Sequence, residues 1–577
     1  MPDRRRPPRA GTLRAVRGPV RGAGVAALLL AVAFLLAPAM GTDLAAQVAR
    51  ANFVDRFGAT PIDLGWYGGV NQFGYSLFTA GLGAALGVRV VGALAAVGSA
   101  LALAWLLVRA GARRPVLGAL LGAVVLVGNL VSGRITFAVG LLFGLLALCA
   151  VAATGTVRSV PGGWVVATGG GRAARVWWLV AAGVLAALAT WASPVAGLFV
   201  GLTGGALLLA NLRLPVRPGP PPRSTRSGSG RARRWRAVRW RTGGHLVGGL
   251  VLCLAPAVAL APMALLFGNG GVQPYSFASM RTNVVLALVV LVVVPRRWPA
   301  VRVGAGLTVL LLIGAYYLES PIGSNALRLP MLFAVPLVAA LADLRWRWLV
   351  PLLVAAVWWQ NPVMVSDLTR AGSTESRAGF YRPLVTELSR RAPIGRIEVV
   401  PLRDHWESAY VAPHVPLARG WERQVDVDRN PLFYADDLTP AEYVAWLRRN
   451  AVSYVAFAPD SPPDRYARQE AALVGAGLPE LRPVWQDRNW RLYQVTDPSP
   501  LVAAPGRLVR SDQHAVTFAS DVPGDLLVRV RWSGFLAVTG QPGACLLPSS
   551  DGWTVVRVTA PGEHRLGSSL TAPGPRC

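Results

Sequence analysis

A single carboxylate stands directly after the first long apolar stretch of the sequence. It is Asp43, in the segment Gly41-Thr42-Asp43-Leu44-Ala45-Ala46-Gln47, and Gln47 follows it by one helical turn. A carboxylate held at a membrane surface can act as a general base on an acceptor hydroxyl. The alternative is structural, because aspartate is also a preferred N-cap residue and residues 43–57 have the pattern of an interfacial helix. Both interpretations predict a helix that begins at this residue.

The elements that position Asp43 are expected to be membrane helices. Hydrophobic residues make up 53% of the 577 residues and charged residues 15%, against roughly 25% charged residues in a soluble domain. A membrane helix needs about 20 mostly apolar residues. Eleven stretches approach that length: 23–40, 88–108, 116–132, 135–153, 176–192, 195–211, 244–266, 283–295, 303–318, 326–342 and 348–364. The sequence therefore predicts an α-helical polytopic membrane protein with about 11 transmembrane helices.

The charge of the links between these stretches alternates. All 58 basic residues are arginine, and the formal net charge is +29. The arginines gather in the tail 1–22, in the loop 212–243 and in every second link, whereas the link 41–77 is nearly neutral. The positive-inside rule then predicts a cytoplasmic N-terminus and a C-terminal region outside the plasma membrane. The excess charge indicates topology, so we expect membrane lipids and no nucleic acid as partners.

The first span has a second interpretation. Residues 1–39 resemble a signal peptide, because a basic start and an apolar stretch lead to Ala37-Pro38-Ala39. We favour an uncleaved helix, since candidate functional residues follow at once. Cleavage would leave the orientation of every later span unchanged.

From about residue 366 the composition is that of a soluble region, with 24 arginines and 23 acidic residues. Leu438-Thr439-Pro440-Ala441-Glu442 predicts a helix start with a capping box, and Val452–Ala458 predicts a buried strand. We therefore expect a transmembrane domain over 23–365, an extracytoplasmic α/β domain over 366–500 and a small β-sandwich-like module over 501–577.

Cysteine and histidine give no sign of a metal centre. The chain has four cysteines and five histidines and no CxxC or other metal-ligand motif. Cys545 and Cys577 fall on the predicted oxidising side, where they can pair. Cys149 and Cys253 fall inside predicted spans, where a small apolar role is the default interpretation.

The order of these features resembles the GT-C superfamily of membrane glycosyltransferases. Its members place an acidic residue directly after the first membrane helix, in a long external loop with a juxtamembrane helix, and many carry a C-terminal extracytoplasmic domain. Asp43, the 41–77 loop, the eleven spans and the 366–577 region follow the same order. The Gly-x-Asp-x-x-x-Gln start and Trp66-Tyr67-Gly68-Gly69 look like segments of large, uncharacterised actinobacterial membrane proteins.

The resemblance implies an inverting transfer of a sugar from a polyprenyl-phosphate-linked donor to a glycan, lipid or protein acceptor of the cell envelope, with Asp43 as the catalytic base. Better-known members have a paired Asp-Glu or Asp-Asp where this chain has Asp43 followed by Leu44. No cofactor is assigned for that reason, and a divalent cation stays an option.

A lipid-linked donor brings an anionic phosphate to the interface, and arginine binds phosphate through bidentate, charge-assisted hydrogen bonds. Arg134 and Arg328 stand at the predicted outer ends of spans and are the candidates. The alternative for each is a long side chain that snorkels to the headgroups.

Further candidates complete the expected site. Glu319 is a candidate second catalytic carboxylate and Asn325 a partner for sugar hydroxyls, although a plain loop explains both residues equally well. The other expected substrate-binding residues are Gln47, Asp63, Trp66 and Tyr67. The aromatic pair would offer a platform to a sugar, and the alternative is the aromatic belt of a membrane interface.

Two other function classes remain open. A many-span transporter or lipid flippase is one, although the spans carry almost no ionisable residue away from their ends and show no evident internal repeat. The other is a non-catalytic envelope assembly protein, in which the C-terminal region binds glycan and the membrane helices serve as an anchor.

Overall fold

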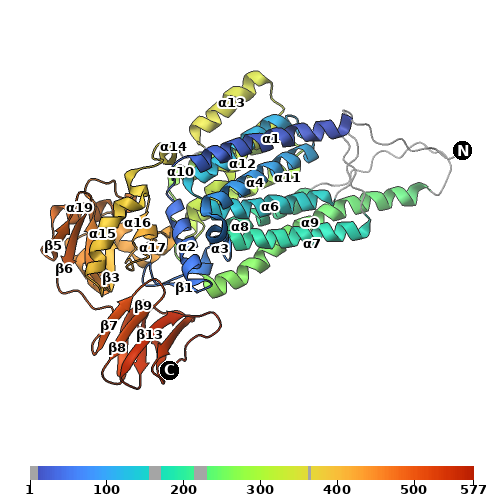
Figure 1. Ribbon diagram of the computed structural model, residues 1–577. Coiled ribbons are helices and arrows are strands. Elements are labelled where there is room, and N and C mark those ends of the chain that lie inside the picture. The colour runs from blue at the N-terminus through green and yellow to red at the C-terminus, as the bar shows by residue number, and fades with distance from the viewer. Residues whose placement is uncertain (1–10, 155–170, 213–229, 362–364) are drawn as a thin grey trace. The chain divides into compact units, whose positions relative to one another are not determined.

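The structure, a computed structural model, describes residues 11–154, 171–212, 230–361 and 365–577 (Figure 1). The chain divides into two compact units. The first, here called the helical unit, comprises Met1–Ala37, Arg89–Leu265 and Tyr275–Val365. The second, called the mixed unit, comprises Pro38–Val88, Leu266–Pro274 and Ser366–Cys577. Three segments far apart in the sequence therefore build the mixed unit.

The helical unit contains the predicted membrane spans. Within the described residues, nine helices are long and apolar enough to cross a membrane, and two shorter apolar helices accompany them. The eleven predicted stretches fall on these helices, which confirms a multi-pass membrane protein. The helices are α1 (Gly11–Leu36), α4 (Val88–Ala110), α5 (Pro115–Gly128), α6 (Ile135–Ala153), α7 (Arg172–Ala192), α8 (Pro194–Leu212), α9 (Gly230–Phe267), α10 (Phe277–Val293), α11 (Pro299–Tyr317), α12 (Arg328–Leu341) and α13 (Trp346–Trp359).

Three of the predicted basic segments lie partly outside the described residues, and the basic link 158–175 is described only from residue 171. Of the tail 1–22, residues 1–10 are not described and the rest belongs to α1. Of the loop 212–243, residues 213–229 are not described, and α9 begins at Gly230.

Small residues let these helices approach closely. A Cβ atom at Gly118 of α5 would meet the Ala340 side chain of α12 at 2.5 Å, and one at Gly140 of α6 would meet Ala196 of α8 at 2.7 Å. Lipid tails offer no hydrophobic driving force between helices, so membrane helices associate through this kind of close packing. The apolar sequence and its small residues together explain the bundle.

The mixed unit begins with short elements that follow the first membrane helix. They are α2 (Leu44–Phe57), β1 (Ile62–Asp63), β2 (Val70–Asn71) and α3 (Thr79–Leu86). β1 and β2 pair antiparallel, with Asp63 opposite Val70. The helix expected over 43–57 is thus present, one residue shorter.

A mixed four-stranded sheet follows in the C-terminal region, in the order β3-β4-β6-β5. Its strands are β3 (Arg396–Val399), β4 (Val452–Phe457), β5 (Leu481–Gln486) and β6 (Arg491–Val495). β3 and β4 are parallel, and the other neighbours are antiparallel. Helices α15 (Ala378–Arg390), α18 (Pro440–Arg449) and α19 (Arg468–Ala476) accompany the sheet, and α18 has the predicted capping box between Thr439 and Glu442.

Two antiparallel sheets complete the mixed unit, in the orders β10-β13-β8-β7 and β11-β12-β9. Their strands are β7 (Gly506–Ser511), β8 (Val516–Ser520), β9 (Gly524–Arg531), β10 (Leu536–Gly540), β11 (Cys545–Pro548), β12 (Trp553–Val558) and β13 (Gly562–Ser568). Inward-facing residues of both sheets form one core, as in a β-sandwich. A disulfide joins Cys545 to Cys577.

The early segment contributes to this C-terminal core. Ile62 and Leu64 are buried in the same cluster as Phe518 and Leu526, and the Leu64 N–H donates to the Gln513 carbonyl at 2.8 Å. Residues 38–88 are therefore part of the C-terminal fold.

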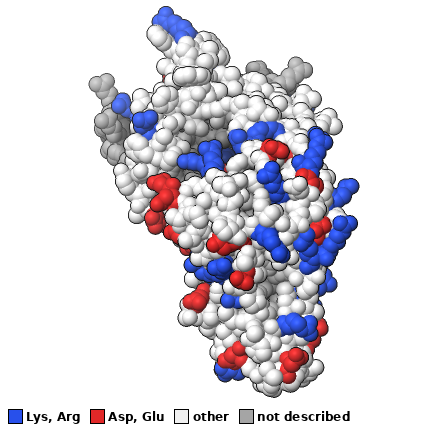
Figure 2. All heavy atoms as spheres, turned by 90° about the vertical axis from the view of Figure 1, so that its left-hand side faces the viewer, with Lys and Arg blue, Asp and Glu red and all other residues white. Residues whose placement is uncertain are grey.

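On the face drawn in Figure 2, basic and acidic side chains lie among one another.

Candidate active site

Asp43 stands at the N-terminus of α2, in the N-cap position, but its side chain makes no capping hydrogen bond to the helix. It is half-buried. Gly41, whose φ of 95° suits glycine, turns the chain just before it. The carboxylate is therefore not used to cap α2, which was the structural alternative for this residue.

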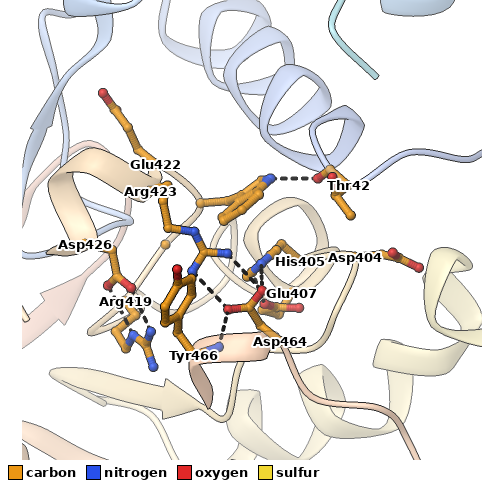
Figure 3. A network of polar contacts seen from close by, with 12 residues as sticks. Thr42, Asp404, His405, Glu407, Arg419, Glu422, Arg423, Asp426, Asp464 and Tyr466 are labelled. Atoms are coloured by element: carbon orange, nitrogen blue, oxygen red, sulfur yellow. Dashed lines mark hydrogen bonds and ion pairs between the residues drawn. The ribbon is translucent and has the colours of Figure 1, made fainter. Parts of the chain in front are cut away.

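The peptide before Asp43 is fixed from the C-terminal region. The Trp421 indole N–H donates to the Thr42 carbonyl at 2.6 Å (Figure 3). The Trp421 ring stacks on His405, with ring centroids 3.6 Å apart and an interplanar angle of 10°. The Arg423 guanidinium lies 4.6 Å from the Trp421 ring centroid, a distance typical of a cation–π contact.

His405 is buried between two carboxylates. Its Nδ1 lies 3.3 Å from Glu407 and its Nε2 lies 3.4 Å from Asp464. Burial by itself lowers the pKa of His405, but the neighbouring carboxylates of Asp464 and Glu407 outweigh burial and leave that pKa raised. The arrangement favours a positively charged imidazole under the indole.

Asp464 also forms an ion pair with Arg423. Its two oxygens accept from both terminal nitrogens of Arg423, at 2.9 and 2.8 Å. Burial raises the pKa of Asp464. His405 and Arg423 lower that pKa by more than burial raises it, so it lies well below the usual range. Tyr466 covers Arg423 with its ring centroid 4.8 Å from the guanidinium. In this network Asp464 thus pairs with both His405 and Arg423 (Figure 3).

A buried ion pair holds the second turn of α2. Arg50 and Glu422 approach to 2.6 Å, with side chains only 6% and 4% exposed. Glu422 also accepts from the Gln424 side chain at 3.0 Å, and Arg50 lies 4.9 Å from the Tyr75 ring centroid. Trp421 and Glu422, which are adjacent in the sequence, therefore fix the start and the second turn of the same helix.

The loop that joins α9 to α10 meets this pair. The Asn269 side chain accepts from the Asn71 N–H at 2.8 Å and donates to the Asn71 carbonyl at 3.0 Å. Its amide nitrogen also lies 3.4 Å from Glu422. A Cβ at Gly271, whose φ is 87°, would collide with the Gln424 backbone. Residues 266–274 are thus packed into the mixed unit.

Three residues predicted to bind substrate are buried in the mixed unit. Asp63 accepts from the Gly65 N–H at 2.7 Å and from the Gln72 amide at 3.1 Å. The Trp66 ring packs against Gly420, and the Tyr67 hydroxyl donates to the Gly420 carbonyl at 2.8 Å. Their exposed fractions are 1%, 0% and 3%, so these contacts support the fold around α2. Gln47 is also buried.

The burial of Asp63 has a measurable pH signature. Burial raises its pKa to about 7, against the lowering effects of the Gly65 N–H and Arg50. The folded-state pKa lies above the unfolded one, so the folded protein holds the proton longer. Stability then decreases as pH rises from about 4 to 7, by up to about 1.4 kcal/mol per pH unit. We expect Asp63→Asn to remove this slope.

The measurement for Asp63 is the thermal midpoint in detergent at pH 5 and pH 8. The midpoint of the wild-type protein should fall more between the two pH values than that of Asp63→Asn. Asp55→Asn, an exposed position on α2, is the control and should follow the wild type. Equal pH dependence in Asp63→Asn and the wild type would contradict the assignment.

The two candidate phosphate ligands belong to the helical unit and share one end of α6. Arg134 is the N-cap residue of α6, directly after Gly133, whose φ of 76° ends the short helix η2 (Asn129–Ser132). The Arg328 guanidinium lies 5.1 Å from the centroid of Phe137, on the first turn of α6. Arg328 is the first residue of α12. The structure thus brings the Arg328 guanidinium to within one helical turn of Arg134 along α6.

An apolar cavity of about 410 Å³ lies in the same unit. Its walls come from α4, α6, α8, α10, α11 and α12, and on α12 they run from Leu329 to Leu341, about 18 Å of helix. The hydroxyls of Thr203 and Thr308 in the wall donate to carbonyls of their own helices. The cavity therefore presents an apolar surface, and Leu329, the residue that follows Arg328 in the sequence, is one of its lining residues.

Glu319 and Asn325 lie between α11 and α12. Glu319 is exposed. Asn325 lies in the short helix η3 (Gly323–Leu327), and its amide donates to the carbonyl of Pro321, just before that helix, at 3.4 Å. Both residues belong to the helical unit, whereas His405 and its polar network belong to the mixed unit. Within the part of the chain that the structure describes, no group of three or more His, Cys, Asp or Glu side chains is placed to hold a metal ion.

The sequence interpretation missed several members of the network. They are Arg50, His405, Trp421, Glu422 and Asp464. One signal was available, since Asp404-His405-Trp406-Glu407 places one of five histidines among acidic residues. Nothing local pointed to the bond between Trp421 and Thr42, because 379 positions separate them.

Comparison with known proteins gives matches to solved structures. The arabinofuranosyltransferase AftD from Mycobacteria matches with 15% identity and a TM-score of 0.44, over 96% of this chain and 57% of that one. The oligosaccharyltransferase AglB from Archaeoglobus fulgidus, in complex with an inhibitory peptide and a dolichol-phosphate, matches with 11% identity and a TM-score of 0.41, over 76% and 69%. ArnT from Cupriavidus metallidurans, bound to undecaprenyl phosphate, matches with 14% identity and a TM-score of 0.34, over 82% and 97%.

All three matches are at low identity, between 11% and 15%. The chain spans 42–60% of the length of the AftD structures it matches. No family model matches the sequence, and no curated protein matches it. At these identities and TM-scores the comparisons assign no role to any single residue.

Proposed function

We propose that the protein is a membrane glycosyltransferase that uses a polyprenyl-phosphate-linked sugar as donor. The observation that carries the proposal is the apolar cavity whose wall on α12 begins at Leu329, directly after Arg328. A ligand with a long apolar chain and an anionic head suits that combination. Arg328 and Arg134 are the proposed partners of the phosphate, because a guanidinium binds phosphate through two hydrogen bonds.

Asp43 is the proposed general base. In the reaction, the acceptor oxygen forms a bond to the anomeric carbon of the sugar, the bond from that carbon to the phosphate oxygen breaks, and the acceptor proton passes to the Asp43 carboxylate. The polyprenyl phosphate leaves as an anion, which the arginines stabilise. The acceptor is a glycan, lipid or protein of the cell envelope. Glu319 and Asn325 remain predicted members of the site.

The proposed orientation places the mixed unit outside the plasma membrane and the N-terminus in the cytoplasm. The distribution of arginine among the links supports it. The disulfide between Cys545 and Cys577 supports it as well, because disulfides persist in oxidising compartments. The acceptor would then be met on the side where envelope polymers are assembled.

The experiment measures transfer from radiolabelled polyprenyl-phosphate sugars to envelope acceptors by the purified full-length protein in liposomes. We expect Arg328→Ala to raise the KM for the donor by about 10- to 100-fold, since charge-assisted hydrogen bonds to the phosphate are lost. Arg281→Ala, at an exposed position on α10, is the matched control and should leave KM unchanged. Donor binding that is equal in both variants would refute the assignment of Arg328, and absence of transfer with every donor would refute the function.

A further inference from the structure

We infer that Trp421, held on His405, is the positioning residue of the Asp43 carboxylate. The inference rests on the proposed function, because it assumes that Asp43 is the base. Trp421 touches neither donor nor acceptor in this scheme. It acts through the backbone of Thr42.

The first step is geometric. The Thr42 carbonyl belongs to the peptide plane that ends at the Cα atom of Asp43. A hydrogen bond to that carbonyl therefore fixes the rotation of the plane and the direction from which the Asp43 side chain leaves the backbone. The Trp421 indole supplies this bond at 2.6 Å. The preceding Gly41 has a φ of 95° and otherwise leaves the turn conformationally free.

The second step is the rigidity of Trp421 itself. One face of its ring lies 3.6 Å from the His405 ring and nearly parallel to it. His405 is 2% exposed and has a φ of 55°, a left-handed conformation that is unfavourable for a residue with a side chain. The carboxylates of Glu407 and Asp464 lie 3.3 and 3.4 Å from its two ring nitrogens. The surroundings thus keep His405 in a strained conformation that supports the indole.

The third step is the link to α2. The residue after Trp421, Glu422, forms the buried ion pair with Arg50 on the second turn of that helix. The residue after that, Arg423, is clamped by Asp464 through two hydrogen bonds. Of these three consecutive residues, Trp421 therefore fixes the start of α2 and Glu422 its second turn. Arg423 anchors the loop itself to Asp464. A loop with this many buried contacts specifies one position for Asp43.

The test replaces Trp421 by phenylalanine, which keeps an aromatic ring on His405 and removes the indole N–H. The matched control is Trp490→Phe, because the buried Trp490 indole also donates to a backbone carbonyl, that of Phe380, at 2.9 Å. We expect Trp421→Phe to lower kcat for transfer by about 10- to 100-fold with the KM for the donor unchanged, since misplacement of a catalytic group reduces the rate without weakening donor binding. Trp490→Phe should leave kcat unchanged.

A second readout does not depend on activity. Hydrogen–deuterium exchange of the amides in residues 41–47 should be about three- to tenfold faster in Trp421→Phe than in the wild-type protein, because one hydrogen bond that holds the turn is lost. In Trp490→Phe this segment should exchange as in the wild type. Unchanged exchange at 41–47 in Trp421→Phe overturns the inference even if transfer is observed. Faster exchange without detectable transfer in any variant retains the positioning contact and refutes the proposed function.

Discussion

Asp43→Asn is expected to abolish sugar transfer while the protein stays folded and inserted. General-base catalysis by a positioned side chain typically contributes about 10²- to 10⁴-fold to the rate, and asparagine keeps the size of the side chain but accepts no proton. The Asp43 carboxylate makes no capping hydrogen bond to α2, so the helix loses no such bond in the variant. Transfer in proteoliposomes and the thermal midpoint are the two measurements.

The matched control for Asp43 is Asp55→Asn. Asp55 lies on the same helix but is exposed, so the same chemical change there should leave transfer and stability unaltered. Full activity of Asp43→Asn would remove Asp43 from the mechanism. A large fall in its thermal midpoint would assign the residue a structural role.

Arg50→Ala is expected to lower the stability of the protein strongly. The substitution leaves the Glu422 carboxylate buried without its guanidinium, and breaking a buried ion pair in this way typically costs about 3–5 kcal/mol. The side chains are 6% and 4% exposed, so water cannot replace the lost partner. A fall of the thermal midpoint by several degrees, together with faster proteolysis of the segment around α2, would be observed.

The chain offers a control pair of the same chemistry at the surface. Arg557 and Asp525 form two hydrogen bonds, at 2.7 and 2.8 Å, but their side chains are 49% and 48% exposed. Exposed ion pairs contribute little because water solvates the charges equally well, so Arg557→Ala should leave the thermal midpoint nearly unchanged. The double substitution Arg50→Met with Glu422→Leu should recover much of the loss of Arg50→Ala, since no buried charge remains. Equal midpoints for Arg50→Ala and Arg557→Ala would contradict this account.

The local elements of the fold were predictable from the sequence. Hydropathy placed the eleven spans because a helix that crosses lipid must be apolar over its length. The α18 helix was predicted from its capping box, whose bonds span three residues. The helix after Asp43 was predicted from its position after an apolar stretch. Each of these signals lies within one element.

The site depends on contacts that no local signal carries. Arg50 meets Glu422 across 372 positions, and Trp421 meets Thr42 across 379. Periodicity and spacing describe one element at a time, so they cannot say which loop will cover Arg50. The same limit explains Trp66 and Tyr67, which read as exposed interfacial aromatics in sequence and are buried against Gly420 in the structure. A local sequence pattern indicates that an aromatic residue needs an apolar neighbour, but it does not identify which distant residue that neighbour is.

The mixed unit is built from early and late segments of the chain, so it can be completed only at the end of translation. Residues 38–88 leave the ribosome long before Phe518 and Leu526, which share a core with Ile62 and Leu64. The membrane helices from α4 to α13 have to be inserted in between. The segment that carries Asp43 therefore stays without its packing partners, with Trp66 and Ile62 exposed, until the last strands have been translated. Translation that stops after α13 would therefore leave a protein with a full set of membrane helices and an incomplete, protease-sensitive site.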